Sequence, residues 1–153
     1  MVSKDYKINI FARLILWLTV ILCAYLKYLG IGFILFFFWY IYVVVYLFHL
    51  IVQEYYLWFL RNNTFNYHNK FKISYISNII FFVITLFTVD CRDDGCKLLI
   101  SFILGSLGDK SSIGNSDMGG FVQNFILLLL IVILNIFILW KIARIKKNII
   151  NAA

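Results

Sequence analysis

Residues 121–147 read FVQNFILLLLIVILNIFILWKIARIKK. The apolar part of this stretch ends at Trp140, and a basic tail follows at once. An α-helix rises ~1.5 Å per residue, so about 20 apolar residues cover the ~30 Å of hydrocarbon in a bilayer. Residues 121–140 therefore predict a transmembrane helix whose basic end stays at one membrane surface.

Three more apolar stretches lie upstream, at 9–29, 31–53 and 73–89. The last of them would rise only about 26 Å as a helix, near the lower limit for crossing a bilayer. Glycines at 30 and 32 mark a turn between the first two stretches, so we expect these to form a tight antiparallel hairpin. The sequence predicts an all-α fold, an integral membrane bundle of four transmembrane helices arranged as two antiparallel hairpins.

The basic residues are sorted unevenly along this four-span thread. With the N-terminus inside, the outer segments hold only four of the fourteen Lys and Arg residues, namely Lys27, Arg92, Lys97 and Lys110. The inner segments hold the other ten: Lys4, Lys7, Arg13, Arg61, Lys70, Lys72, Lys141, Arg144, Lys146 and Lys147. Cytoplasmic segments of membrane proteins carry an excess of Lys and Arg, so we expect both chain ends inside, N-in and C-in.

The composition agrees with a membrane environment. The 153 residues are 63% hydrophobic and 20% aromatic, which is more apolar surface than a soluble core of this size can hide. We expect residues 1–153 to form a single membrane domain in contact with the lipid bilayer. The net charge of +7 would suggest nucleic-acid binding in a soluble protein, but here the basic residues flank the spans. Contact with anionic lipid headgroups is the better interpretation, and no nucleic-acid partner is expected.

The segment between the last two spans is predicted to be an outer loop over residues 90–120. An apolar piece at 98–107 is too short to cross a bilayer and predicts an interfacial or re-entrant segment. Cys91 and Cys96 are candidates for a local disulfide if this face is oxidising, and for free thiols if it is reducing. The spacing of the two cysteines and the neighbouring aspartates matches no zinc site, so no metal is predicted.

Most of the intramembrane polarity lies toward the inner side of the spans. Arg13 and His49 stand eighteen residues on either side of residue 31, so they should share a depth in neighbouring helices. An ion pair of Arg13 with Glu54 is expected close to the inner surface. Six side chains are candidates for polar contacts between helices: Arg13, His49, Gln53, Glu54, Asn78 and Asn135. We interpret them as groups that fix helix pairing, Asn78 and Asn135 by their matching depths, with a proton or ion path as the alternative.

The sequence carries no motif for a specific chemistry. G-x-S-x-G, H-E-x-x-H and the P-loop are all missing, so no catalytic residue and no enzyme activity are predicted. His49 is the only histidine in a predicted span, which argues against a haem held by paired histidines, and no cofactor is predicted. We expect a non-enzymatic structural or assembly subunit that packs with other membrane proteins or with copies of itself. A small oligomeric channel or transporter is the alternative.

Two settings suit a protein of this layout, a membrane complex of an organelle or bacterium and a viral envelope. In its charged ends, four spans and polar loop, the chain resembles the small four-span virion membrane proteins of some plant and insect RNA viruses. The resemblance implies a place in a virion membrane. It covers layout alone and assigns no site residue.

Overall fold

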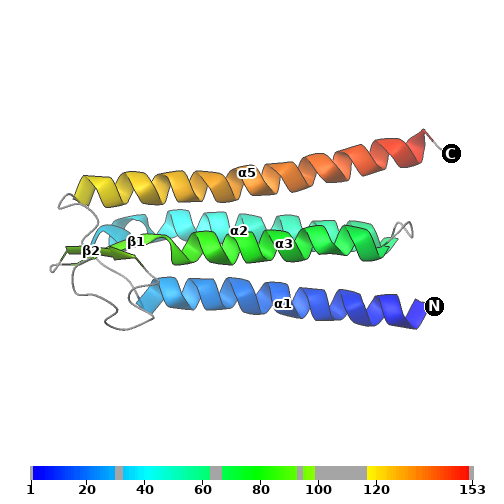
Figure 1. Cartoon of the computed structure of the whole chain (residues 1–153), viewed down its shortest axis with the longest axis horizontal. Helices are drawn as coiled ribbons and strands as arrows, with labels where there is room; N and C mark the ends of the chain where they lie inside the picture. Colours follow the sequence, from blue (N-terminus) through cyan, green and yellow to red (C-terminus); the bar gives the residue numbers. More distant parts are fainter. Residues whose placement is uncertain (1, 30–32, 63–66, 93–94, 99–116, 152–153) are drawn as a thin grey trace.

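The computed structural model describes residues 2–29, 33–62, 67–92, 95–98 and 117–151. The described residues contain four helices: α1 (Val2–Leu29), α2 (Phe33–Asn62), α3 (Tyr67–Leu86) and α5 (Asp117–Ile150). These helices lie side by side and alternate in direction, so α1 begins and α5 ends at the same end of the bundle (Figure 1). We call this the terminal end.

The opposite end carries a small β-hairpin that the sequence did not predict. Strand β1 (Val89–Arg92) pairs antiparallel with β2 (Gly95–Leu98), next to the ends of α2 and α5 (Figure 1). We call this the hairpin end. Strands of four residues are too short to reveal an alternating apolar pattern, which is why a loop was expected there.

The rest of the expected outer loop 90–120 is only partly described. Residues 99–116, which hold nearly all of the expected interfacial segment 98–107, lie outside the described residues, as do the glycines at 30 and 32. Helix α5 begins at Asp117, inside the stretch expected to be loop. An acidic residue in the first turn is favourable because it faces the positive end of the helix dipole.

Three of the described helices are long and apolar enough to cross a membrane, over Ile10–Tyr28, Trp39–Arg61 and Val122–Asn148. The apolar part of α3, Lys72–Leu86, is shorter. The second stretch continues beyond the expected end at residue 53. It does so because the following turns bury apolar side chains against the bundle, among them Tyr56, Leu57 and Leu60.

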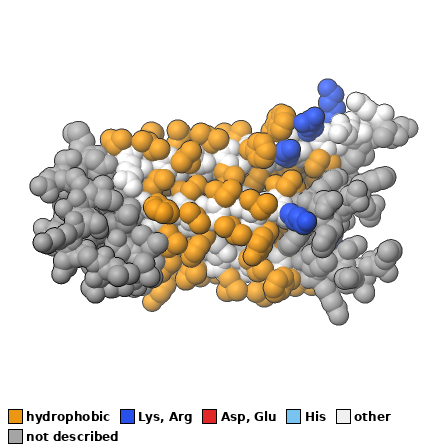
Figure 2. Space-filling model, viewed as in Figure 1, with side chains coloured by type: hydrophobic (Ala, Val, Ile, Leu, Met, Phe, Trp, Pro, Cys, Tyr) orange, Lys and Arg blue, Asp and Glu red, His pale blue; other side chains and the backbone are white. Residues whose placement is uncertain are grey.

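The outer surface of the bundle is apolar. Figure 2 shows hydrophobic side chains covering the middle of one face, while the visible Lys and Arg side chains gather at the terminal end. Large apolar side chains on α1, α2 and α5 are more than half exposed, for example Phe11 at 63%, Ile51 at 64% and Phe125 at 61%. Soluble proteins rarely expose contiguous apolar surface on this scale, whereas lipid is a natural environment for it.

Helix α2 is the central helix of the bundle. It buries 56% of its membrane-length stretch, compared with 28% for each of α1 and α5, and it packs against all three other helices. Two clusters of buried apolar side chains follow its length. The cluster toward the hairpin end includes Leu16, Tyr46, Phe81 and Ile131, and the cluster toward the terminal end includes Tyr56, Leu60, Ile138 and Ile142.

Candidate functional site

Helix α3 and the residues directly after it have one polar face, and this face is directed toward the other helices. The polar side chains on this face recur at spacings of three and four residues, and each is at most 5% exposed: Ser74, Ser77, Asn78, Thr85 and Thr88. The opposite face of α3 exposes apolar side chains: Ile76, Ile79, Ile80, Val83 and Phe87. We call the inward-facing groups and their partners the buried polar network.

His49 of α2 links three helices in the middle of this network. Its Nδ1 lies 3.0 Å from Oδ1 of Asn135 on α5, and its Nε2 lies 3.1 Å from Oδ1 of Asn78 on α3. His49 and Asn135 are fully buried, and Asn78 is 5% exposed. One imidazole ring therefore ties α2 to α3 and to α5.

The second hydrogen bond of Asn135 fixes which nitrogen of His49 donates. Asn135 Nδ2 donates to the carbonyl oxygen of Ile131 at 2.8 Å, so its Oδ1 faces the ring and His49 Nδ1 is the donor. In a neutral ring Nε2 then accepts from the amide NH₂ of Asn78. In a protonated ring Nε2 donates to the amide oxygen of Asn78. A half-turn of the Asn78 amide separates the two arrangements.

Gln53, one turn further along α2, forms a second polar layer with α3. Its Nε2 donates to Ser77 Oγ at 2.7 Å, and Ser74 Oγ donates to its Oε1 at 2.7 Å. All three side chains are at most 2% exposed. His49 and Gln53 are four residues apart, so both lie on the face of α2 that meets α3.

A third polar layer lies toward the hairpin end. Tyr46 donates from its hydroxyl to Thr85 Oγ1 at 3.3 Å, and Thr85 in turn donates to the carbonyl oxygen of Phe81 at 3.0 Å. Lys27 of α1 donates from Nζ to Thr88 Oγ1 at 2.9 Å. These contacts join α1 and α2 to the end of α3.

Arg13, Glu54 and Trp17 form a more exposed polar group between α1 and α2. Arg13 Nε lies 3.2 Å from Glu54 Oε2, and Trp17 Nε1 donates to Glu54 Oε1 at 3.0 Å. The Arg13 and Glu54 side chains are 32% and 28% exposed. This group therefore sits at the rim of the bundle rather than in its interior.

The structure sorts the six predicted polar residues into three sets. Arg13 contacts Glu54. His49 lies on a different face of α2 from Glu54 and is hydrogen-bonded to both Asn78 and Asn135. Gln53 contacts two serines. The prediction did not include the remaining members of the network: Lys27, Tyr46, Ser74, Ser77, Thr85 and Thr88. The spacing of the hydroxyls in residues 74–88 was the signal available for finding the α3 members, because polar groups on a membrane helix face inward.

The cysteines fall at two separate places. Cys91 and Cys96 are directly opposite each other in the register of the β-hairpin, while Cys23 is a free thiol buried completely between the helices. Directly paired residues on antiparallel strands have Cα atoms about 4.5–5.5 Å apart, within the range that a disulfide spans. Over the described part of the chain, no three His, Cys, Asp or Glu side chains lie close enough to hold a metal ion.

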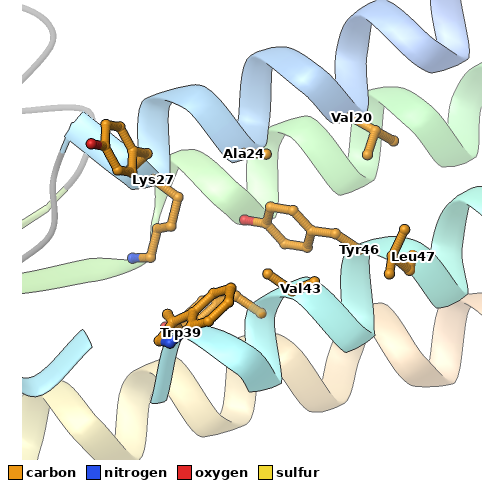
Figure 3. Close-up of a pocket in the computed structure, with 9 residues that line it drawn as sticks. Val20, Ala24, Lys27, Trp39, Val43, Tyr46 and Leu47 are labelled. Carbon is orange, nitrogen blue, oxygen red and sulfur yellow. The ribbon is translucent and has the colours of Figure 1, made fainter. Parts of the chain in front are cut away.

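An apolar groove lies between α1 and α2 toward the hairpin end, with a volume of about 320 Å³. Val20 and Ala24 line it from α1, and Val43 and Leu47 line it from α2. Figure 3 shows Lys27 reaching from α1 toward the α2 side, with the ring of Tyr46 projecting into the space between the helices. We refer to this feature as the α1–α2 groove.

Comparison with protein-family models, curated proteins and solved structures found no match for this chain.

Proposed function

We propose that the chain is a four-span membrane protein with both ends on the cytoplasmic side, and that it acts without enzymatic activity as a structural or assembly subunit. The observation that carries the proposal is the inward direction of the buried polar network. The His49, Gln53, Asn78 and Asn135 side chains are all used in hydrogen bonds that join helices.

The amphipathic character of α3 supports four spans rather than three. Its apolar part, Lys72–Leu86, rises about 21 Å as a helix, and the whole helix of 20 residues rises about 30 Å, so its basic first turns reach the level of the headgroups. Its hydropathy is low because the hydroxyl and amide groups on one face lower the average. Those groups are bonded to α2 and α1, and the face directed away from the bundle is as apolar as the surfaces of the longer helices.

The distribution of charge supports the orientation. The exposed basic side chains of Arg61, Lys72, Arg144, Lys146 and Lys147 lie on the parts of α2, α3 and α5 nearest the terminal end. Basic residues at the ends of spans remain on the cytoplasmic side during insertion. The charge distribution therefore supports an orientation with the terminal end inside and the β-hairpin outside.

The outer helices support a role in assembly. α1 and α5 leave most of their apolar surface exposed, with Leu18 at 57% and Ile21 at 58% on α1 and Phe125 at 61% on α5. In a bilayer these faces contact lipid or the helices of neighbouring proteins. Van der Waals packing on such apolar faces drives association between membrane helices.

A small oligomeric channel or transporter is the second candidate, and the length of the polar stripe favours it. From Ser74 to Thr88 the stripe extends about 21 Å along the helix axis, most of the way across a bilayer. Polar groups spread over that depth are what an ion or proton pathway would need, and here the buried ring of Phe81 lies between two of the polar layers.

Purification and flux measurements separate the two candidates. Extraction from native membranes in a mild detergent should recover the protein with a fixed, stoichiometric set of membrane partners. Purified protein in liposomes should give no proton or ion flux above protein-free vesicles. Flux that is lost in Asn135→Leu and kept in the matched lipid-facing variant Ile136→Leu would overturn the structural role in favour of transport.

A further inference from the structure

The hydrogen bonds of His49 set the helices in register and so indicate where the hydrocarbon ends. Because His49 is bonded to Asn78 and to Asn135, these three residues lie at one depth. Lys72 lies six residues before Asn78 and Lys141 lies six residues after Asn135, so both are about 9 Å from that depth toward the terminal end. Lys72 begins the apolar part of α3, and the apolar run of α5 ends directly before Lys141. We call this level the inner boundary.

Helix α5 continues beyond the inner boundary and stays packed on the bundle. From Lys141 to Ile150 it rises about 14 Å further, and Figure 1 shows it running past the start of α3. Ile142 is 4% exposed and belongs to the buried cluster of Tyr56 and Leu60, and Ile145 packs against that cluster. One side of this extension is therefore fixed to α2, and the other side is exposed above the membrane.

A row of cations runs along the exposed side of the extension. Lys141, Arg144 and Lys147 follow one another at intervals of three residues, so each stands about 4.5 Å above the previous one along the helix. Arg144 and Lys147 are exposed, and Lys141 is partly buried. With Lys141 at the inner boundary, Arg144 lies about 4.5 Å and Lys147 about 9 Å above it. We call these three residues the cation row.

Trp140 positions the two lower members of the row. Lys141 Nζ lies 5.6 Å and Arg144 Cζ lies 5.5 Å from the centroid of its ring. Trp140 is 52% exposed, at the level of a membrane where tryptophan is favoured. A contact of this kind holds a cation over the face of the ring and leaves its N–H groups able to donate to an anion.

No carboxylate among the side chains that the structure describes competes for the cation row. Glu54 is the only acid among those side chains, and it is bound by Arg13 and Trp17 of α1. Figure 2 shows Lys and Arg side chains at this end of the molecule without an acidic neighbour on the visible described surface. The row therefore presents its positive charge to a ligand from outside the chain.

The height of the row selects among anionic ligands at the membrane. The headgroup layer adds roughly 5–7 Å to each side of the hydrocarbon, and a lipid with one phosphate carries its charge at the base of that layer, near Lys141. A headgroup with further phosphates on a sugar ring carries negative charge farther out, at the heights of Arg144 and Lys147. Orientation during insertion requires basic residues near the boundary, but it does not require a row of this height on a packed helix.

We propose that the cation row binds a lipid of the inner leaflet whose headgroup carries phosphates beyond the phosphodiester, such as a phosphorylated inositol. The phosphodiester lies at Lys141 and the outer phosphates lie at Arg144 and Lys147, where the guanidinium can donate two parallel hydrogen bonds to one phosphate. The proposal rests on the terminal end lying at a membrane surface, as in the proposed function, and is independent of the structural or assembly role.

Bromine quenching of Trp140 fluorescence measures which lipid occupies this position. Trp17→Phe, Trp39→Phe and Trp58→Phe leave Trp140 as the only tryptophan. The full chain is reconstituted in phosphatidylcholine vesicles with brominated phosphatidylinositol bisphosphate, or with brominated phosphatidylglycerol at the higher mole fraction that gives equal total charge. A cation close to a membrane surface contributes about 1 kcal/mol, so the two further cations should make each bisphosphate molecule bind about thirty-fold more tightly.

Variants in this background test the row itself. Lys147→Gln should weaken binding of the bisphosphate about five-fold and leave phosphatidylglycerol unchanged, while Lys147→Arg should keep the preference. Lys147→Gln combined with Asn148→Lys keeps the net charge but moves the cation about 100° around the helix, so it should not restore binding. Lys72→Gln removes a cation from α3 at the inner boundary and should leave the preference unchanged.

The contrary results are equally defined. Equal quenching by the two lipids at equal charge would overturn the assignment, and so would restoration by Asn148→Lys, because both would show diffuse attraction to a charged surface. Inositol trisphosphate that binds in detergent as tightly as the lipid binds in vesicles would make the ligand a soluble phosphate compound. An acidic protein that co-purifies and blocks the quenching would reassign the row to that protein. Ion flux in liposomes would overturn the structural role alone and leave this lipid site in place.

Discussion

The rings of His49 and Phe81 lie flat against each other, with centroids 4.2 Å apart and planes inclined by 8°. Phe81 also meets Tyr46 edge to face at 5.0 Å, so it occupies the space between the His49 layer and the Tyr46–Thr85 layer. It is fully buried. The aromatic ring therefore separates two polar layers and keeps each set of hydrogen bonds in a dry environment, where such bonds are strengthened.

Removing the Phe81 ring should destabilise the bundle strongly. Phe81→Ala leaves a cavity beside His49, and truncations of buried phenylalanine cost about 3–5 kcal/mol. The measurement is unfolding of the purified protein in mixed micelles with increasing denaturing detergent. Phe87→Ala, in the turn directly after the same helix, is the control, because Phe87 is 47% exposed and its loss should cost much less. Equal losses in the two variants would contradict this account.

Asn135→Leu should destabilise the protein by about 1–3 kcal/mol, because it leaves His49 Nδ1 without its buried acceptor. Leucine is close to asparagine in volume, so the effect isolates the lost hydrogen bond from a change in packing. Thermal unfolding in detergent gives the comparison, with Ile136→Leu as the matched control, because Ile136 is exposed on the surface of the bundle. A loss no larger than that of the control would show that the bond contributes nothing to stability.

Gln53 and Ser77 should be energetically coupled. Their hydrogen bond is 2.7 Å long and fully enclosed, and interhelical bonds of this kind contribute about 0.6–1.7 kcal/mol. A double-mutant cycle of Gln53→Leu and Ser77→Ala measures that coupling free energy. The cycle of Gln53→Leu with Thr85→Val provides the reference, since Thr85 bonds elsewhere on the helix and the two changes should be additive.

Cys91 and Cys96 should form a disulfide in protein taken from an oxidising compartment, because the register of the β-hairpin sets them opposite each other. Alkylation of the denatured protein without reductant should then modify Cys23 alone, and alkylation after reduction should modify all three cysteines. Mass spectrometry counts the modified thiols. Three modified thiols without reductant would mean that the hairpin cysteines are free.

The proposed four-span topology predicts which compartment each segment faces. In a cysteine-free background, Ser3→Cys and Asn151→Cys should react with an impermeant thiol reagent from the cytoplasmic side. Ser112→Cys in the expected outer loop should react from the other side. In a three-span arrangement, with α3 lying outside the bilayer, Ser3 and Asn151 would be in different compartments. Ser112 would then react from the same side as Ser3.

Counting residues along the sequence was enough to place polar groups by depth but not around the helix. Arg13 and His49 share a depth by count. Arg13 meets Glu54, the partner expected from the sequence, while His49 lies between Asn78 and Asn135, a contact that depth alone did not predict. Glu54 lies five residues after His49, and at 3.6 residues per turn this rotates it about 140° from the His49 face. Direction around a helix depends on which neighbours it packs against, and that information comes from the assembled bundle.

The four apolar segments were readable from the sequence because length and hydropathy depend only on local composition. The interior of α3 was harder to predict, since Ser74, Ser77 and Thr85 are common residues with no chemical signature of their own. Their spacing acquires meaning only when Gln53 and Tyr46 face them from α2. The β-hairpin was missed for the related reason that its stability comes from pairing and from contact with α2 and α5.

The polar face of α3 also has a consequence for biosynthesis. A helix with this many hydroxyl and amide groups enters lipid reluctantly by itself. The hydrogen-bond partners of those groups precede α3 in the sequence and so leave the ribosome before it. They are Lys27, His49 and Gln53. Synthesis in this order provides a docking surface before the helix that needs it emerges, and α5 then closes the bundle when Asn135 reaches His49.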